Sequence, residues 1–193
     1  MIILYQIPED ATAKRLRKIL EKENIEHMYV TKELAGQTIG DLFAGVKDAK
    51  PCEDPTLPED PTVVFSGKDF SNEEAGKLLD KFFDNDIVFG FPVYASDDLM
   101  QLPLGDVLVA QRNYQEFLQK LSFLQQMIDG CASLKPESYD PDKWSNLKIA
   151  IADANDFLDA VVNDSEGNLD KIEPRDADKI LSNMQTAMKN LLS

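Results

Sequence analysis

Ser66-Gly67-Lys68 stands where a phosphate-binding loop would lie, because an apolar run precedes it and a helical pattern follows it. A complete loop of this kind needs a glycine five residues before Gly67, and that position holds Thr62. It also needs serine or threonine after its lysine, and Asp69 stands there. We therefore interpret the segment as a turn with one lysine.

A second stretch, with Asp164, Glu166, Gly167 and Glu173, has the separation of glycine and final glutamate found in calcium-binding loops. Val162 occupies the first ligand position of such a loop. A valine side chain offers no oxygen to a calcium ion, so the sequence predicts no calcium site here.

The single histidine, His27, lies in an expected strand without a motif around it, so no Ser-His-Asp or Cys-His arrangement is indicated. Two cysteines, Cys52 and Cys131, have neither disulfide-framework nor metal-site spacing. The sequence predicts no catalytic residue, no metal ligand and no cofactor. The enzyme question stays open, with a non-enzymatic role favoured.

The elements that would position these residues form one pattern written twice within residues 1–110. Each copy reads strand, helix, strand, short helix, which predicts an α/β domain with a four-stranded sheet. The equivalent segments are Ile2-Ile3-Leu4-Tyr5 with Val63-Val64-Phe65-Ser66, the helical positions Leu16, Ile19 and Leu20 with Leu79, Phe82 and Phe83, and Thr38-Ile39-Gly40-Asp41-Leu42 with Pro103-Leu104-Gly105-Asp106-Val107.

The strands of the two copies differ in character. The first strand of each copy is a continuous apolar run, which predicts two central strands lying side by side. The second strand of the first copy, about Glu26 to Val30, alternates in polarity, and its equivalent contains Pro92. Proline cannot donate to a neighbouring strand, so we expect both second strands at the edges of the sheet.

An acidic, proline-rich linker at residues 48–61 joins the two copies. It contains four prolines, five acidic residues and little that could be buried, so we expect a mobile connector. A role as an acidic docking segment is the alternative.

Residues 111–193 show three amphipathic helical stripes and therefore predict a three-helix bundle. Trp144 is expected in its core. Between Leu104 and Asp129 there is no proline, and Gly130 is the first strong stop signal, which predicts a helix that crosses the domain boundary without a break or with one kink near residues 110–113.

The formal charge of −15 is spread over both halves of the chain. Such a chain lacks the basic field that binds phosphates, so neither nucleic acid nor an anionic membrane is an expected partner. The N-terminal apolar run is shorter than a signal-peptide core or a membrane span. We therefore expect a bacterial, cytoplasmic protein.

Two family resemblances accompany this pattern. Phe65-Ser66-Gly67, Phe70-Ser71-Asn72-Glu73-Glu74 and Leu104-Gly105-Asp106-Val107-Leu108 resemble the bacterial family named domain of unknown function 3783, over residues 1–110 and best over 62–108. Residues 139–193, with Tyr139, Trp144, Leu147 and a final helix ending Leu191-Leu192, resemble FIVAR-type helical modules. The resemblances imply a domain shape and a helical bundle, and neither implies a catalytic residue.

These observations predict a non-enzymatic binding or protein-interaction module of uncharacterised function, with a possible protein partner. They do not predict an oligomeric state. The alternative is a small-molecule-binding or enzymatic α/β domain. Its site would lie at the carboxyl ends of the central strands, near Gln6, Ser66, Gly67 and Lys68.

Overall fold

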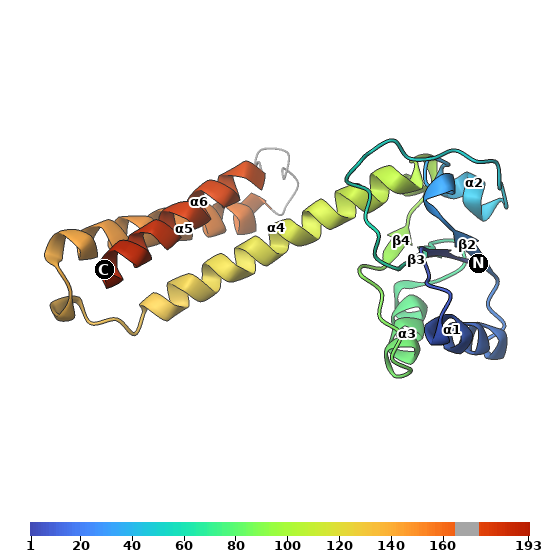
Figure 1. Ribbon diagram of the computed structural model, residues 1–193, viewed down its shortest axis with the longest axis horizontal. Helices are drawn as coiled ribbons and strands as arrows, with labels where there is room; N and C mark the ends of the chain where they lie inside the picture. The colour runs from blue at the N-terminus through green and yellow to red at the C-terminus, as the bar shows by residue number, and fades with distance from the viewer. Residues whose placement is uncertain (165–173) are drawn as a thin grey trace. The chain divides into compact units, whose positions relative to one another are not determined.

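The structure is a computed structural model that describes residues 1–164 and 174–193 (Figure 1). The chain divides into two compact units, Met1–Asn113 and Tyr114–Ser193. The division falls inside a helix, near the boundary predicted between residues 110 and 111.

The first unit is built on a four-stranded mixed sheet with the strand order β2-β1-β3-β4. The central strands β1 (Ile2–Tyr5) and β3 (Thr62–Ser66) are antiparallel, and all their residues are buried. The edge strands β2 (His27–Val30) and β4 (Val93–Ala95) pair in parallel with β1 and β3. The prediction of two adjacent central strands with the second strands at the edges is confirmed.

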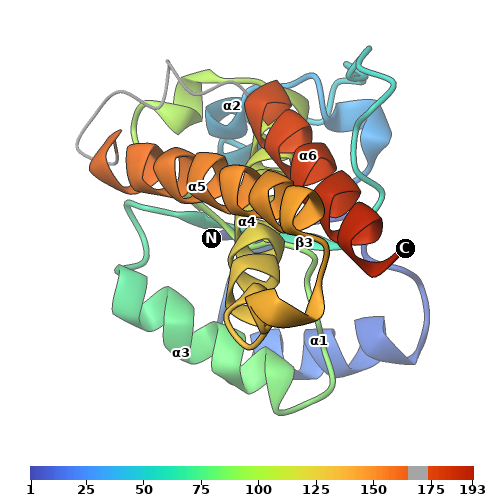
Figure 2. The ribbon, with the colours of Figure 1, turned by 90° about the vertical axis from the view of Figure 1, so that its left-hand side faces the viewer.

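Helices cover both faces of this sheet, as expected of an α/β fold (Figures 1 and 2). Helices α1 (Ala11–Lys22) and α3 (Asn72–Phe83) lie on one face, where they bury Ile2, Leu4, Val63 and Phe65. The other face is covered by α2 (Ile39–Phe43) and the first turns of α4 (Leu104–Cys131), over Ile3, Tyr5 and Val64. Successive residues of each central strand thus point to opposite faces.

A capping box formed by Ser71 and Glu74 starts α3. The Glu74 N–H donates to Ser71 Oγ at 3.3 Å, and the Ser71 N–H donates to Glu74 Oε2 at 2.8 Å. Two backbone donors that helix formation leaves unpaired are satisfied reciprocally. Asp10 caps α1 more simply, by accepting from the Thr12 N–H at 2.6 Å.

The predicted match between positions of α1 and positions of α3 is wrong by one residue. Leu16 and Leu20 of α1 are fully buried, but Phe83 of α3 is 71% exposed and Leu79 is only partly buried. The fully or nearly buried positions of α3 are instead Ala75, Leu78 and Phe82. Burial therefore matches Leu16 and Leu20 with Leu78 and Phe82, one position before the predicted Leu79 and Phe83.

Helices α1 and α3 end in the same way. A residue with a left-handed backbone follows each helix, Asn24 at φ 53° and Asp86 at φ 57°. The next residues, Ile25 and Ile87, donate their N–H groups to carbonyls five residues earlier, at 2.8 and 3.0 Å. This pattern is the Schellman motif, in which asparagine and aspartate tolerate the left-handed position better than most residues.

The segments that lead into α2 and α4 exchange backbone hydrogen bonds. The Ile39 N–H donates to the Leu102 carbonyl at 3.0 Å, and the Leu104 N–H donates to the Gln37 carbonyl at 2.9 Å. Ile39 and Leu104 hold the same place in the two predicted copies, as do Gln37 and Leu102. The two halves of the first unit are therefore joined by a pair of equivalent backbone hydrogen bonds, one donated by each half.

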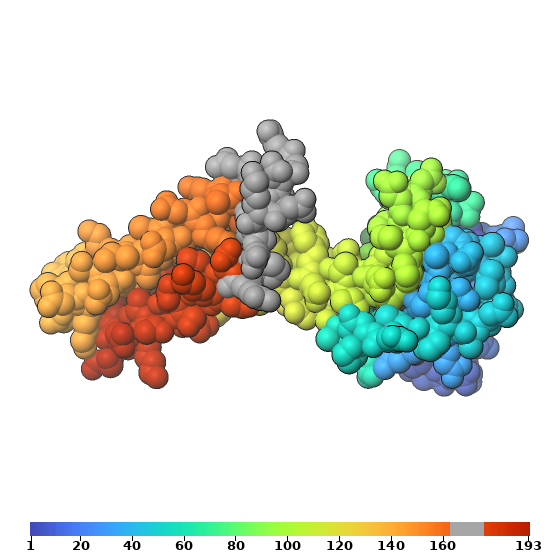
Figure 3. Space-filling view, turned by 90° about the horizontal axis from the view of Figure 1, so that it is seen from above, coloured from blue at the N-terminus to red at the C-terminus, as the bar shows by residue number. Residues whose placement is uncertain are grey.

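The connector 48–61 is packed against the first unit, contrary to the expectation of a mobile segment with little to bury. Leu57 is 9% exposed within the core, and Pro58 is buried beside it. The Tyr5 hydroxyl donates to the Pro58 carbonyl at 3.0 Å, and the Gly36 N–H donates to the Lys50 carbonyl at 2.7 Å. Figure 3 shows this segment, in cyan, against the body of the unit.

The second unit contains the later turns of α4 together with α5 (Pro141–Asp164) and α6 (Pro174–Leu192). Helix α4 runs unbroken from Leu104 to Cys131, which confirms the predicted continuous helix. All three helices contribute to one hydrophobic cluster, with Leu124, Met127, Leu147, Ala154, Met184 and Leu191 among its buried members. Within residues 1–164 and 174–193, no helix combines the length and apolar composition that crossing a bilayer requires.

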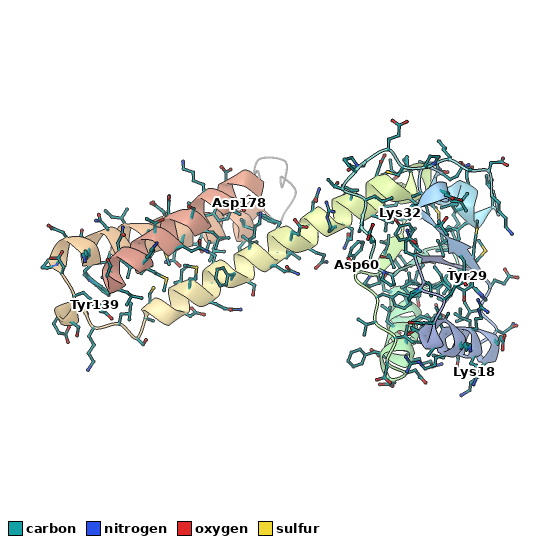
Figure 4. The ribbon with its side chains drawn as sticks, in the orientation of Figure 1. Lys18, Tyr29, Lys32, Asp60, Tyr139 and Asp178 are labelled. Atoms are coloured by element: carbon teal, nitrogen blue, oxygen red, sulfur yellow. The ribbon has the colours of Figure 1, made fainter. Side chains whose placement is uncertain are left out.

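Trp144 lies at the margin of this cluster and is only half-buried. Its ring stacks on Tyr139, labelled in Figure 4, with centroids 6.1 Å apart and planes 8° apart. The fully buried positions are Leu147, Ala154 and Met184. The expectation that Trp144 fills the centre is wrong, because it stands in the first turn of α5, where fewer neighbours cover it.

Candidate functional site

The structure keeps Ser66, Gly67 and Lys68 together but places Gln6 at the other end of the sheet. Gln6 follows β1 and Ser66 ends β3, and these strands are antiparallel, with Tyr5 paired with Thr62. A rise of about 3.4 Å per residue separates Gln6 from Ser66 by about 17 Å along the strands. Only parallel strands bring their carboxyl ends to one edge, so the predicted site is divided between two ends of the sheet.

The Ser66 end forms a closed turn. The Lys68 N–H donates to Ser66 Oγ at 3.3 Å, and the Lys68 ammonium pairs with Asp97 at 3.5 Å. The N-terminal ammonium of Met1 lies 2.7 Å from the Asp69 carboxylate. The charges that a phosphate would need are therefore engaged with carboxylates of the chain itself.

Beside this turn lies a hollow of about 280 Å³ that carries charges of both signs, here named the charged hollow. Its lining includes Glu23, Asp69, Glu74, Lys77 and Lys81. Lys81 pairs with Glu23 at 2.6 Å, Lys77 pairs with Glu73 at 2.6 Å, and Asp69 holds the N-terminus. Most of these charges are balanced by neighbours.

An open depression of about 460 Å³ lies near the start of β2 and contains the single histidine. Its polar lining comes from Glu21, Asn24, Glu26 and His27. His27 Nδ1 lies 3.3 Å from the Ile25 carbonyl, and the His27 ring meets Tyr29 edge to face, with centroids 5.3 Å apart. The histidine is thus held by contacts with β2 and with the residues just before it.

The end of the sheet at Gln6 has a different lining, and we name it the apolar hollow. Its volume is about 240 Å³. Seven of its nine lining residues are apolar: Ile7, Pro8, Leu16, Pro61, Ile87, Val88 and Phe89. Thr12 and Asp86 supply the polar part of the lining. Val88 is 68% exposed, so its side chain is open to solvent at the rim.

The two hollows occupy matching places in the two halves of the first unit. Thr12 and Leu16 line the apolar hollow from α1 as Glu74 and Leu78 line the charged hollow from α3. Each hollow also includes the isoleucine after a Schellman turn. One end is closed by ion pairs, and the other presents hydrocarbon.

Gln6 borders the apolar hollow in an unusual backbone conformation. Its φ is 52°, a left-handed value that costs a non-glycine residue of order 1 to 3 kcal/mol. The Gln6 N–H donates to the Val30 carbonyl at 3.0 Å, and the Gly67 N–H makes the matching bond to Ala95 at 3.0 Å. The bend directs the chain from β1 into Ile7 and Pro8, which line the hollow.

Carboxylates at the Ser66 end are held in their charged form. The N-terminal ammonium, hydrogen-bonded to Asp69, lowers the pKa of that carboxyl, and the Ser71 backbone N–H lowers the pKa of Glu74. Depressed pKa values stabilise the folded state above the unfolded pKa, and this stability is lost as the pH falls through the folded pKa.

We therefore expect the free energy of unfolding to decrease as the pH falls from about 5 toward 3, the range that includes the ordinary pKa values of Asp and Glu and extends toward the lowered values of the folded state. Urea titrations at a series of pH values measure this dependence. The variant Asp69→Asn/Glu74→Gln should show a shallower decrease. An unchanged slope would contradict the assignment of these two carboxylates.

Metal binding gains no candidate from the described part of the chain, where no group of three or more His, Cys, Asp or Glu side chains could hold an ion. The stretch with the calcium-like spacing, from Asp164 to Glu173, lies almost entirely outside the described residues.

No family model matches the chain, and neither the curated proteins nor the solved structures include a match. The resemblances to domain of unknown function 3783 and to FIVAR-type modules therefore stay predictions from the residues.

Sequence reasoning missed the apolar hollow. The available signal was the run Ile87-Val88-Phe89, which is apolar yet precedes Pro92 and lies outside β4. An apolar run that forms no strand must pack elsewhere or remain exposed. Here Ile87 is buried, Phe89 is half-buried, and Val88 is exposed.

Proposed function

We propose that this chain is a non-enzymatic protein-interaction module, and that its first unit binds an apolar side chain of a partner protein in the apolar hollow. The carrying observation is the hydrocarbon lining of this hollow, with Val88 exposed at its rim. Interfaces gain most of their affinity where an apolar anchor enters such a site and excludes water.

The size of the apolar hollow favours a side chain over a metabolite. Its volume of about 240 Å³ lies below the roughly 300 to 1,000 Å³ of small-molecule pockets. One leucine, methionine or phenylalanine side chain is a suitable occupant. The few polar groups in the lining would not orient a metabolite.

The titratable groups with shifted pKa values also support a non-enzymatic role, because several of them are engaged in structural bonds. Asp10 caps α1 and Glu74 caps α3, while Glu23 pairs with Lys81. In each case a hydrogen bond to the carboxylate lowers the pKa. Burial raises the pKa of the Cys131 thiol, which makes it a poor nucleophile.

We further propose that the first unit arose by duplication of a strand-helix-strand-helix element. The exchanged bonds of Ile39 and Leu104 and the two Schellman turns support this origin. The three helices that share one hydrophobic cluster favour the predicted bundle for residues 111–193. The free thiols Cys52 and Cys131 agree with the proposed cytoplasmic location.

A small-molecule site is the second candidate, and the open depression at His27 favours it. Its volume of about 460 Å³ falls within the range of ligand pockets, and Glu21 and Glu26 belong to the same lining as His27. A metabolite that raised the melting temperature of the chain, but not that of His27→Ala, would support this candidate.

The protein-interaction proposal can be tested with N-acetyl-leucinamide as a probe of the apolar hollow. We expect methyl resonances of Ile7, Ile87 and Val88 to shift in a saturable way in carbon-13 NMR titrations of the full chain. Val88→Asp should abolish these shifts, because burying an unpaired carboxylate opposes binding of hydrocarbon.

Val162→Asp is the matched control, because Val162 is also 68% exposed and belongs to the second unit. It should leave the titration unchanged. Shifts that are absent, or that Val162→Asp removes equally, would refute the apolar hollow as the binding site.

A further inference from the structure

Acidic side chains outnumber basic ones around the apolar hollow. The three chain segments that form most of it, 6–12, 58–62 and 84–92, hold six acidic residues and no lysine or arginine. Three of these acids line the hollow or neighbour a lining residue, and Asp10 accepts a hydrogen bond from the lining Thr12; we name the four the acidic collar: Glu9, Asp10, Asp60 and Asp86.

The collar is fixed by local structure. Asp10 caps α1 through the Thr12 N–H, and the hydrogen bond to that N–H lowers the pKa of Asp10. Asp60, labelled in Figure 4, stands where the chain enters β3, with its Cβ packed beside Gly90. Asp86 lines the hollow from the left-handed turn after α3. All four collar residues are exposed.

Two basic side chains of α1 act on this collar, and one of them, Arg17, attracts Glu9 electrostatically while its guanidinium lies over the Tyr29 ring. Arg15 Nη1 lies 3.3 Å from Asp86 Oδ2, so its charge is already matched. Within residues 1–164 and 174–193, Asp60 forms no ion pair. The matching charged hollow differs, since Lys77 and Lys81 lie in its lining. The apolar hollow, and not the charged hollow, is therefore the one with an excess of negative charge around it.

We infer that the partner segment is basic, with one apolar anchor side chain flanked by lysine or arginine. This inference rests on the proposed function, in which the anchor enters the apolar hollow. The flanking cations would then lie over Glu9 and Asp60. A second copy of this chain or an anionic lipid is disfavoured, because each would bring negative charge to the collar.

The formal charge of the whole chain, −15, acts in the same direction as the collar. A cationic segment is attracted from beyond contact distance, and the attraction is screened over about 8 to 10 Å at physiological salt. The collar therefore selects by charge, and the hollow selects by shape and hydrophobicity.

Three labelled peptides test the inference by fluorescence anisotropy with the full chain: Lys-Lys-Leu-Lys-Lys, Ser-Ser-Leu-Ser-Ser and Lys-Lys-Ser-Lys-Lys. We expect the basic leucine peptide to bind at least about tenfold more tightly than either other peptide at low salt. Its advantage over the serine-flanked peptide should shrink in 0.5 M salt.

Two double variants locate the effect. Glu9→Lys/Asp60→Lys should weaken binding of the basic leucine peptide at least about tenfold and leave the serine-flanked peptide within about twofold. Asp153→Lys/Asp156→Lys makes the same change of net charge at exposed positions of α5 and should have little effect. Far-ultraviolet circular dichroism verifies that both variants are folded.

The outcomes separate the inference from the proposed function. Equal binding of the two leucine peptides, both lost in Val88→Asp, would overturn the basic partner and leave the hollow in place. Binding that depends neither on the leucine of the peptide nor on Val88 would overturn both the inferred basic partner and the proposed function. Equal weakening by the two double variants would reduce the effect to net charge and overturn the inference. Self-association lost in Val88→Asp would identify a second copy and overturn it too.

Discussion

Phe82→Ala is expected to lower the free energy of unfolding by about 3 to 5 kcal/mol, while Phe83→Ala changes it by less than about 0.5 kcal/mol. The two phenylalanines are adjacent in α3 but face different surroundings. Phe82 is fully buried and meets Phe89 edge to face, with centroids 5.4 Å apart, whereas Phe83 is 71% exposed. Removing the buried ring leaves a cavity that the sheet and α1 cannot fill.

Chemical denaturation followed by far-ultraviolet circular dichroism measures both changes. The pair is its own control, because the substitutions are identical and one residue apart. Similar losses for the two variants would restore the helix register in which Phe83 takes the place of Leu20. A small loss for Phe82→Ala alone would mean that α3 packs loosely.

Gly105→Ala is expected to destabilise the chain by about 2 kcal/mol, although alanine favours helices over glycine. A Cβ at this position would lie 2.5 Å from Cys52 Sγ, 2.7 Å from Cys52 Cβ and 3.2 Å from the Ala35 carbonyl oxygen. These contacts are too short, so the connector would have to move off the start of α4. The loss measures how firmly the connector is packed.

Gly76→Ala provides the matched helix control, because a Cβ there would meet nothing within 4 Å. It should stabilise the chain by about 0.5 to 1 kcal/mol. Cys52→Gly should relieve much of the Gly105→Ala loss, with a coupling of at least about 1 kcal/mol in a double-mutant cycle. An additive cycle would show that the connector does not contact Gly105.

The positions of the strands could be predicted because the apolar composition of the central strands indicates that they are buried. Ile2-Ile3-Leu4 and Val63-Val64-Phe65 are apolar at every position, which suits only strands covered on both faces. Pro92 before β4 marked an edge for the equally direct reason that it lacks a donor. Such signals depend only on residues close together in the chain, so they can be recognised in a single sequence.

The candidate site could not be predicted, because it depends on strand direction. Nothing in the residues of β1 or β3 says whether the two strands run parallel or antiparallel. That direction decides whether Gln6 meets Ser66 or lies about 17 Å from it. The apolar hollow was missed for a related reason, since it unites Pro8, Pro61 and Val88 from segments far apart in the chain.

Two smaller errors have physical causes of the same kind. Phe82 and Phe83 are both aromatic, so hydrophobic spacing alone could not decide which of them faces the sheet. The connector has a composition typical of disordered segments, but Leu57 supplies one buried anchor and Tyr5 supplies a hydrogen bond to the next residue. Average composition hides contacts that single residues make.

The unbroken helix α4 has a consequence for how the chain folds. Leu104 and Leu108 anchor one end of it in the core of the first unit, and Leu124 and Cys131 anchor the other in the cluster of the second. Starting a helix is costly, but lengthening one is cheap. We therefore expect the unit that folds first to provide a nucleated helix that the other unit can extend, so that one nucleation event serves both units.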